Sequence, residues 1–549
     1  MGNGSSDSDK SLDVDVDSQG DVYVSGFYNN QGTFGPINMP FYASSKEAYV
    51  AKLDSLGNYI WVRSCHSGLD DRGLGVHVDP FDNVLFTGTY WYNGTFQATN
   101  TGGSADESFI AKYDSNGGLL WAQHGGSSGD DHCFDVVSDA RGDHYVTGFL
   151  STHYGPVPSG VAFGNLPAFQ IYDSIAYVGK LSAAGTWLWV KTFGGNDVER
   201  DNDIALDSLG NVYVAGGFYR TRTFGPQTLT STVNSRDIFV AKWDSTGNFQ
   251  WVVTAGDSLD DRANGICIDK AQNIYITGEF RDRVGFGTAD TINNYGGPGG
   301  RDIFVAKLTT QGNWVWAQRA GATSGGDRGN AITTDHKGLL FVTGQMRGNV
   351  HFGNDTTVFC AAADTLQIFA ACIDTSGDWK WAVQAGGPDE DRGNGIAIDT
   401  AGCRIYVAGF IDAPSADFGS DNLPVIGRKD GFVARLNGGC YVQNGPPPPP
   451  PPTPTVECTA VVPLVFTPNG DGINDDFELI DGACVETVDW KIFNRWGQIV
   501  FETTDPAKKW DGHSTQGNLL SDGVYYYVLK VTMVNGEEAL RKGFVSLYR

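Results

Sequence analysis

The chain has 549 residues, of which 40% are hydrophobic, so it is long enough for more than one domain and can bury a sizeable core. Acidic residues outnumber basic residues by 64 to 38, and the net charge of −26 argues against nucleic acid as a partner, because phosphate binding needs a basic surface. No apolar run of about 18 residues occurs, so we expect no membrane span. The first ten residues lack a basic start and an apolar stretch, so no signal peptide is expected in the chain as written.

One sequence unit recurs along most of the chain. It reads GG-x-x-x-DRG-x-GI-x-ID, then S-x-GN-x-YV-x-GxF, then a variable stretch, then DIFVAK-x-DS-x-GN-x-x-W. The FVAK-like segment occurs seven times, and the tryptophan that follows it occurs six times. The FVAK-like segments begin at Tyr49, Phe109, Tyr177, Phe239, Phe304, Phe369 and Phe432, and the tryptophans are Trp61, Trp121, Trp189, Trp251, Trp316 and Trp381.

Each unit holds four short runs of β-branched and aromatic residues that are separated by turn signals. The D-S-x-G-N segments suit tight hairpins, because Asp bonds nearby backbone and Gly supplies a positive φ. Radially repeated four-stranded antiparallel units indicate a propeller, here of seven blades over residues 1–443. An open β-solenoid is the alternative. The unit resembles the bacterial SBBP β-propeller repeat family, which implies a fold but no single activity.

An up-and-down blade sorts its connections onto two faces. The tight turns between strands one and two and between strands three and four share one face. The variable loops between strands two and three share the opposite face, together with the crossovers from strand four to the next strand one. We expect function on this loop face.

A proline-rich segment and a smaller domain follow the repeats. Residues 444–455 contain seven consecutive prolines from Pro446 to Pro452, which favour a semi-rigid polyproline II linker. Residues 456–549 alternate strand-like runs and turns, which suggests an Ig-like β-sandwich. VFTPNGDGINDDF at 465–477, KIFNRWGQIVFET at 491–503, WDG at 510–512, LSDGVYYYVLKV at 520–531 and the terminal KGFVSLYR resemble the gliding-motility-associated C-terminal domain. That resemblance implies a type B sorting domain, a partner in the type IX secretion machinery, and an extracellular or outer-membrane cell-surface location.

An acid–base dipeptide opens strand one of every unit, close to the expected axis on the loop face. It forms either a structural ring of ion pairs and hydrogen bonds or a ligand-binding mouth. Four residues after the acid, three units carry Asp13, Asp135 and Asp203, which could together hold a cation in the channel. The dipeptides are Asp9-Lys10, Asp71-Arg72, Asp131-His132, Glu199-Arg200, Asp261-Arg262, Asp327-Arg328 and Asp391-Arg392.

Aromatic residues follow strand two in several units. Flat aromatic rims suit sugar rings, so these residues predict a glycan-binding rim on the loop face, with packing inside the loops as the alternative. The residues are Tyr28, Tyr90, Trp91, Tyr92, Tyr154 and Tyr219.

The C-terminal domain contains a candidate calcium site. Several oxygen-bearing side chains crowd one turn, as Ca²⁺ requires, although the segment lacks the distant Glu of an EF-hand. A metal-free network of Asx turns is the alternative. The candidate ligands are Asn469, Asp471, Asn474, Asp475 and Asp476.

Nine cysteines leave at least one thiol unpaired. Cys458 and Cys484 flank the first strands of the C-terminal domain and are expected to pair. Cys403 and Cys440 lie at strand ends that antiparallel pairing brings together, so they form a second expected disulfide. Cys267 is expected to be a buried free thiol.

No hydrolase, metalloprotease or nucleotide-binding motif is present, so we do not expect an enzyme. The favoured function is a secreted or surface propeller that binds a glycan or a protein, for example in adhesion. A structural subunit of an extracellular assembly and a polysaccharide-active enzyme are the alternatives. Apart from possible Ca²⁺, no cofactor is expected.

The two ends of the repeat region predict how the ring closes. Aligning Met1-Gly2 with Ala255-Gly256 places the start of the chain after a fourth strand that it does not contain. The last unit ends after its third strand, and only 440–443 could add a short edge. We therefore expect a last blade of three full strands and closure through side chains of residues 12–16.

Overall fold

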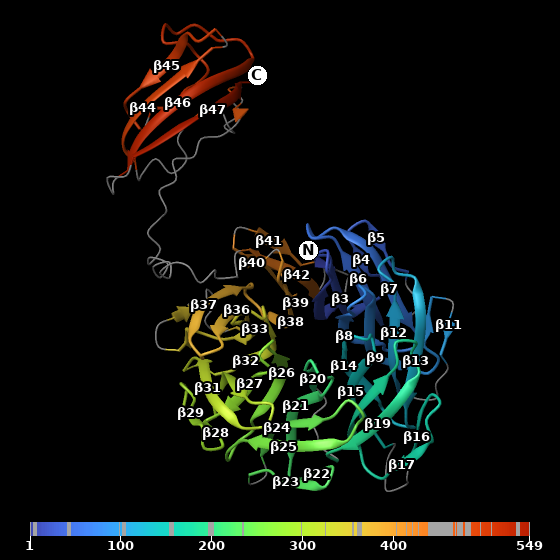
Figure 1. Ribbon diagram of the computed structural model, residues 1–549. Coiled ribbons are helices and arrows are strands. Elements are labelled where there is room, and N and C mark those ends of the chain that lie inside the picture. The colour runs from blue at the N-terminus through green and yellow to red at the C-terminus, as the bar shows by residue number, and fades with distance from the viewer. Residues whose placement is uncertain are drawn as a thin grey trace. The chain divides into compact units, whose positions relative to one another are not determined.

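The computed structural model is all-β (Figure 1). The chain divides into two compact units, Met1–Tyr441 and Val442–Arg549. The described residues are 2–3, 8–40, 45–97, 99–101, 106–152, 159–195, 202–232, 235–297, 299–323, 325–353, 356–358, 365–401, 403–412, 414–419, 421–425, 428–437, 465–466, 468, 476–477, 485–494, 496–506, 508–533 and 538–547. The predicted linker 444–455 lies outside them.

The repeats of the first unit fold into antiparallel meanders, in which each strand pairs with its neighbours in the unit. The first three meanders are β2 (Lys10–Val16), β3 (Val22–Asn29), β6 (Lys46–Leu53) and β7 (Tyr59–His66); β8 (Arg72–Val78), β9 (Val84–Trp91), β12 (Asp106–Tyr113) and β13 (Leu119–Gly126); and β14 (His132–Ser138), β15 (His144–Leu150), β18 (Ile175–Leu181) and β19 (Trp187–Phe193).

The next meanders follow the same order. They are β20 (Asp203–Leu206), β21 (Val212–Tyr219), β24 (Arg236–Trp243) and β25 (Phe249–Ala255); β26 (Arg262–Ile268), β27 (Ile274–Arg281), β30 (Arg301–Leu308) and β31 (Trp314–Gly321); and β32 (Arg328–Thr334), β33 (Leu339–Met346), β36 (Gln367–Asp374) and β37 (Trp379–Ala385). The last sheet contains β38 (Arg392–Asp399), β39 (Arg404–Asp412), β42 (Lys429–Asn437) and β1 (Gly2–Asn3).

The sheets follow one another around a common centre, as Figure 1 shows. The first strand of each sheet contacts the first strand of the next, in the order β2, β8, β14, β20, β26, β32 and β38, and β38 contacts β2 again. Hydrophobic clusters lie between neighbouring sheets; one of them joins Tyr213 and Val240 to Ile276 and Phe304 of the following sheet. The repeats therefore form a closed, propeller-like ring.

Each connection between strands two and three carries a small hairpin. Several hairpins also bond to the fourth strand of the preceding sheet: Thr95 pairs with His66, Gly125 with Phe163, and Ala320 with Phe352. The variable stretches thus cover the outer strands. The hairpins are β4 (Thr33–Phe34) with β5 (Ile37–Asn38), β10 (Thr95–Phe96) with β11 (Thr99–Asn100), β16 (Ser159–Phe163) with β17 (Phe169–Ile171), β22 (Thr221–Phe224) with β23 (Gln227–Thr230), β28 (Arg283–Phe286) with β29 (Asp290–Asn293), β34 (Val350–Phe352) with β35 (Thr356–Val358), and β40 (Ser415–Phe418) with β41 (Asp421–Pro424).

The ring closes partly through backbone pairing, which corrects the sequence expectation. Gly2 pairs with Phe432 and Asn3 with Gly431, and the Asp9 N–H donates to the Lys429 carbonyl at 2.7 Å. Asn3 therefore takes the place that Ala255 holds opposite Ile238, two residues later than the alignment predicted. The three full strands of the last sheet are present as expected, whereas residues 440–443 lie outside the described residues.

The second unit contains one five-stranded sheet in its described part. The order is β43 (Val465–Phe466), β47 (Glu538–Leu547), β46 (Gly523–Met533), β44 (Val485–Phe493) and β45 (Ile499–Thr503), and only the β43–β47 pair is parallel. Phe477, Trp490, Trp510 and Tyr525 form its core.

No helix in the described part of the chain has the length and apolar character needed to cross a bilayer.

Candidate functional site

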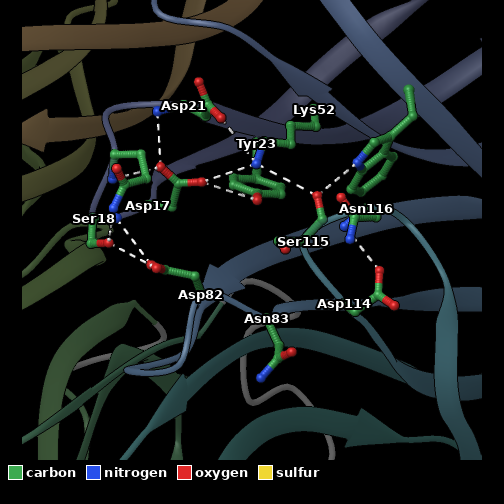
Figure 2. A network of polar contacts seen from close by, with 12 residues as sticks. Asp17, Ser18, Asp21, Tyr23, Lys52, Asp82, Asn83, Asp114, Ser115 and Asn116 are labelled. Carbon is green, nitrogen blue, oxygen red and sulfur yellow. Dashed lines mark hydrogen bonds and ion pairs between the residues drawn. The ribbon is translucent and has the colours of Figure 1, made fainter.

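The turn face carries a repeated polar network, which Figure 2 shows between the first two sheets. Lys52, which is almost completely buried, places its Nζ 3.1 Å from Asp17 Oδ2 and 3.0 Å from Asp21 Oδ2. The Tyr23 hydroxyl donates to Asp17 at 3.1 Å, and the Trp61 indole N–H donates to the Ser115 carbonyl of the next sheet at 3.1 Å. Burial lowers the pKa of Lys52, but the hydrogen bonds to Tyr23, Asp21 and Asp17 outweigh it and raise the pKa.

The same contacts recur around the ring. Five of the six repeated indole N–H groups donate to a carbonyl in the turn of the following sheet, and several strand-three lysines pair with turn carboxylates of their own sheet. The indole bonds hold neighbouring sheets together, whereas the ion pairs fix each turn to its own sheet, so the turn face is structural. The indole bonds are Trp121 to Ala183, Trp189 to Ser245, Trp251 to Thr310 and Trp316 to Thr375, and the ion pairs include Lys112–Asp79 at 2.7 Å and Lys180–Asp143 at 3.0 Å.

On the loop face, the acid of each described dipeptide is fully buried and bonds to backbone. Asp261 shows the pattern: its Oδ2 accepts from the Asp257 N–H at 3.0 Å, its Oδ1 from the Arg281 N–H at 3.1 Å, and its own N–H donates to Arg236 of the preceding sheet at 2.8 Å. The side chain thus ties a crossover to a second strand, and the backbone of the same residue bonds the neighbouring sheet. We call the six described members the latch carboxylates: Asp9, Asp71, Asp131, Asp261, Asp327 and Asp391.

Burial raises the pKa of five of these carboxyl groups, although backbone hydrogen bonds favour their charged form; the five are Asp71, Asp131, Asp261, Asp327 and Asp391. The pKa of Asp71 rises to about 7, and those of Asp261 and Asp327 rise to about 8. Their contacts are those of structural groups rather than of ligand-binding groups.

The base of each dipeptide has a different environment. Lys10, Arg262, Arg328 and Arg392 are partly exposed and Arg72 is exposed, at the starts of successive inner strands. We call these five residues the axial cations. Burial and then the positive charges of Lys429, Arg392 and Arg72 lower the pKa of Lys10 to about 8, which shows that several cations converge near it.

Acidic partners neutralise only part of this group. Arg328 forms two bonds to Glu279, at 2.9 and 3.1 Å, and Arg392 lies 3.9 Å from Glu390. Within the described residues, the Arg72 side chain has no hydrogen bond or ion pair, although its charge acts on the carboxyl groups of Asp70 and Asp106. Sequence analysis predicted that both residues of each dipeptide belong to one ring. In the structure, the acid is buried and the base beside it is at least partly exposed. Glu199 and Arg200 lie outside the described residues.

Phe410 also belongs to this region, although sequence analysis did not select it. The Nζ atoms of Lys10 and Lys429 lie 4.3 and 4.8 Å from its ring centroid. No motif marked it, because Phe410 directly follows the repeated Gly409 and thus holds the variable position of the GxF ending.

The axial aspartates lie together but do not form a metal site in the described part of the chain. Asp13 Oδ2 accepts from the Val76 N–H of the next sheet at 2.9 Å, and Asp203 Oδ2 accepts from Ile266 at 2.7 Å. Burial and the nearby Asp203 raise the pKa of Asp135. The axis is crowded: a Cβ added at Gly395 would lie 2.8 Å from the Asp13 Cα atom.

The predicted aromatic rim is wrong for two of its six residues. Tyr28 and Tyr90 are fully buried against the hairpins, and Tyr28 packs on Phe34. Trp91 and Tyr219 are partly exposed, whereas Tyr92 is 51% exposed. Tyr154 lies outside the described residues. The sequence could not show that the hairpins cover the ends of strand two.

The remaining predicted sites are described only in part. Cys403 is disulfide-bonded, and its expected partner Cys440 lies outside the described residues, as do Cys458 and Cys484. Cys267 is a free thiol as expected, but it is only partly buried. Of the calcium candidates, only Asp476 is described, 3.7 Å from Lys509; Asn469, Asp471, Asn474 and Asp475 are not described.

Two curated relatives match the chain at low identity. An uncharacterized WD repeat-containing protein of Acanthamoeba polyphaga mimivirus is 24% identical over 522 residues, covering 77% of this chain and 37% of the relative. The regulatory protein FlaEY of Caulobacter vibrioides is 23% identical over 276 residues, covering 47% of this chain and 28% of the relative. The chain thus spans about a third of the length of these relatives.

Solved structures resemble the chain only distantly. A mutant puromycin hydrolase complexed with PGG has a TM-score of 0.40 at 12% identity and covers 79% of this chain and 52% of its own. PorZ, a surface component of the type IX secretion system of Porphyromonas gingivalis, has a TM-score of 0.18 at 11% identity and covers 99% of both chains. TM-scores this low do not establish a shared fold.

The C-terminal segment has a family match of its own. Residues 460–547 match the CHU_C Type IX secretion signal domain, and the motifs of the sequence analysis fall within or beside this range. The chain therefore carries a type IX secretion signal domain at its C-terminal end, and such a signal marks a secreted or cell-surface protein.

Proposed function

We propose that this chain is a seven-bladed β-propeller of the SBBP type with an Ig-like secretion domain, exported by the type IX system, and that its loop face binds an anionic ligand. An acidic surface glycan is the ligand class that we favour. The main observation behind this proposal is that the axial cations gather near one another although the whole chain has a net charge of −26.

The axial cations suit a carboxylated or sulfated polymer for two reasons. Their heads are spaced around the ring axis on successive inner strands, so that an anionic polymer can meet more than one of them. Arg72 is exposed and Arg392 has only a distant acidic neighbour, so both have bonding capacity for a ligand. Guanidinium groups match the planar geometry of carboxylates.

Binding of polygalacturonate and dextran sulfate to the full chain, with neutral dextran for comparison, tests the proposal. Arg72→Glu combined with Arg392→Glu should weaken binding about tenfold or more, which corresponds to about 1.4 kcal/mol. Arg141→Glu is the matched control, because Arg141 is 71% exposed on the turn face. Equal losses in both variants, or equal binding of neutral dextran, would contradict a site at the axis.

We also propose that the protein binds its ligand without turning it over. Incubation of the full chain with acidic and neutral polysaccharides should release no new reducing ends. Release that disappears in an axial-cation variant would establish the polysaccharide-active alternative instead.

Calcium binding by residues 469–476 remains a second proposal, supported by the oxygen-rich turn chemistry of the segment. Added Ca²⁺ should raise the unfolding temperature of the chain relative to EDTA, and Asp471→Asn with Asp475→Asn should abolish the shift. An unchanged unfolding temperature in the parent chain would favour the metal-free Asx turns.

A further inference from the structure

In three sheets, the cation that opens strand three has an acidic partner. In the first and fourth sheets, the partner is the crossover residue that precedes the latch carboxylate. In the last sheet, the partner lies directly opposite the cation on strand two. The pairs are Lys46–Asp70 at 2.6 Å, Arg236–Asp260 at 3.5 Å and Lys429–Asp412 at 2.9 Å. The charge at this position is therefore neutralised within the protein in these sheets.

The fifth sheet, which contains β26, β27, β30 and β31, has the cation but neither of these partners. Arg301 opens β30, and the crossover residue before the latch carboxylate Asp327 is Gly326. Directly opposite Arg301 on β27 lies Arg281, which is a second cation. Like charges that face each other across an antiparallel pair are destabilising. A bound anion would offset this repulsion.

Further arginines gather at the same place around one carboxylate. Arg328 of the next sheet donates two hydrogen bonds to Glu279, at 2.9 and 3.1 Å, and Arg301 Nη1 lies 3.3 Å from Glu279 Oε2, the atom that Arg328 Nε also contacts. Glu279 and Arg281 are two residues apart on β27, so their side chains share one face of the strand. Arg262 lies opposite Glu279 on β26. Positive charge is thus in excess around Glu279.

The guanidinium groups keep bonding capacity at the surface. The side chains of Arg301 and Arg328 are 35% and 23% exposed, and Arg281 is partly exposed. Among the described residues, the Arg281 side chain has no hydrogen bond or ion pair. Burial, and then the charges of Arg281 and Arg328, lower the pKa of Arg301, whereas the charges of Glu279 and Asp260 raise it. The three arginines are therefore close enough to act on one another and on a common ligand.

We propose that Arg281, Arg301 and Arg328 bind a tetrahedral oxyanion ester, a sulfate or phosphate group carried by the anionic glycan. Such a group presents three terminal oxygens to donors from three strands, whereas a carboxylate presents two. Glu279 already supplies a carboxylate to this cluster. The inference rests on the proposed binding of an acidic glycan and names its acidic group; Arg328 belongs both to this site and to the axial cations.

Titration of the full chain with dextran sulfate and with polygalacturonate, at one salt concentration, tests the site. The variant combines Arg301→Gln with Arg281→Asn, which copies Asn29, the equivalent residue of the first sheet. It should bind dextran sulfate about tenfold or more weakly and polygalacturonate no more than about twofold more weakly. Arg281→Asn alone removes no side-chain hydrogen bond or ion pair of the described residues, so it should fold normally and show the same selectivity with a smaller loss.

Arg236→Gln is the matched control. Arg236 holds the position of Arg301 in the fourth sheet, but Asp260 lies 3.5 Å from it. This variant should bind both polymers like the parent chain. A loss of dextran sulfate binding equal to that of the double variant would show that general surface charge, rather than the arginine cluster, holds the polymer, and would overturn the inference.

Small competitors identify the oxyanion. Glucose 6-sulfate or glucose 6-phosphate should displace dextran sulfate from the parent chain, and the stronger of the two names the natural ester. Glucuronate that competes as well as either ester would overturn the preference for a tetrahedral group. Binding of both polymers without a selective loss in the arginine variants would overturn this inference and leave the proposed function standing. Binding of neither polymer by the parent chain would overturn both.

Discussion

The two faces of the ring use the same repeat differently. On the turn face, the same contacts recur in several sheets: Lys52 pairs with Asp17 inside its own sheet, and Trp61 donates to the Ser115 carbonyl of the next sheet. On the loop face, the acid bonds backbone while the neighbouring base stays partly exposed, as with Asp71 and Arg72. On the turn face, the repeated residues therefore have a structural role. On the loop face, the repeated acid is structural, whereas the repeated base next to it is available at the surface.

The largest effect is expected from the buried ion pair of the turn face. Lys112→Met leaves Asp79 charged and fully buried without its 2.7 Å partner, and should lower the free energy of unfolding by about 3–5 kcal/mol. Lys46→Met on the loop face breaks a 2.6 Å pair whose Asp70 is 50% exposed, and should cost about 0–1 kcal/mol. Urea unfolding measures the free energy of unfolding of both variants. Similar losses in the two variants would contradict the difference between the two faces.

The latch carboxylates give the next effect, a pH dependence of stability. Their folded pKa values, about 8 for Asp261 and Asp327, lie above the usual value of about 4 for an unfolded Asp, so the folded state binds more protons between these limits. Stability from these groups is full below about pH 4 and is lost as the pH rises through about 8. The free energy of unfolding should therefore fall from pH 5 to pH 8.

Asp261→Asn provides the control for this pH dependence. The amide cannot titrate, so the variant should show a smaller fall between pH 5 and pH 8 than the parent chain. An undiminished fall would assign the pH dependence to the overall negative charge rather than to the latches.

A smaller effect should separate the indoles of the two faces. Trp316→Phe removes the bond to the Thr375 carbonyl and should cost about 1 kcal/mol more than Trp91→Phe, whose indole N–H has no hydrogen-bond partner in the described residues. Both changes remove the same volume, so the difference in unfolding free energy reports the hydrogen bond.

The smallest effect belongs to the exposed loop face. Tyr92→Ala should change the free energy of unfolding by no more than about 0.5 kcal/mol, because the side chain is 51% exposed. A loss of several kcal/mol would show that this part of the loop face is as structural as the turn face.

The sequence predicted strands and turns well because both depend on local patterns. The segment 54–58 illustrates this: Asp54 accepts from the Leu56 and Asn58 N–H groups at 2.9 and 2.8 Å, as a D-S-x-G-N turn requires. The FVAK-like segments likewise form strand three of each sheet, where β6 and β12 are buried on both faces.

Long-range placement could not be predicted in the same way. Each latch carboxylate bonds a residue about 20 positions downstream, as Asp71 bonds the Trp91 N–H, and no local pattern encodes that pairing. Tyr90 was expected on a rim because its strand ends there, but a hairpin folded over it. The arginine cluster around Glu279 was equally hidden, because Arg328 lies 49 positions further along the chain.

The pairing of Asn3 with Gly431 also sets an order of events in time. Because synthesis runs from the amino end, residues 2–3 are made long before residues 431–432, and they cannot pair until the last repeat has been synthesised. Contacts this distant in sequence are entropically costly and slow to form. We therefore expect ring closure to be a late step of folding, and until it occurs the first and last sheets expose strand edges that can pair with the wrong partner.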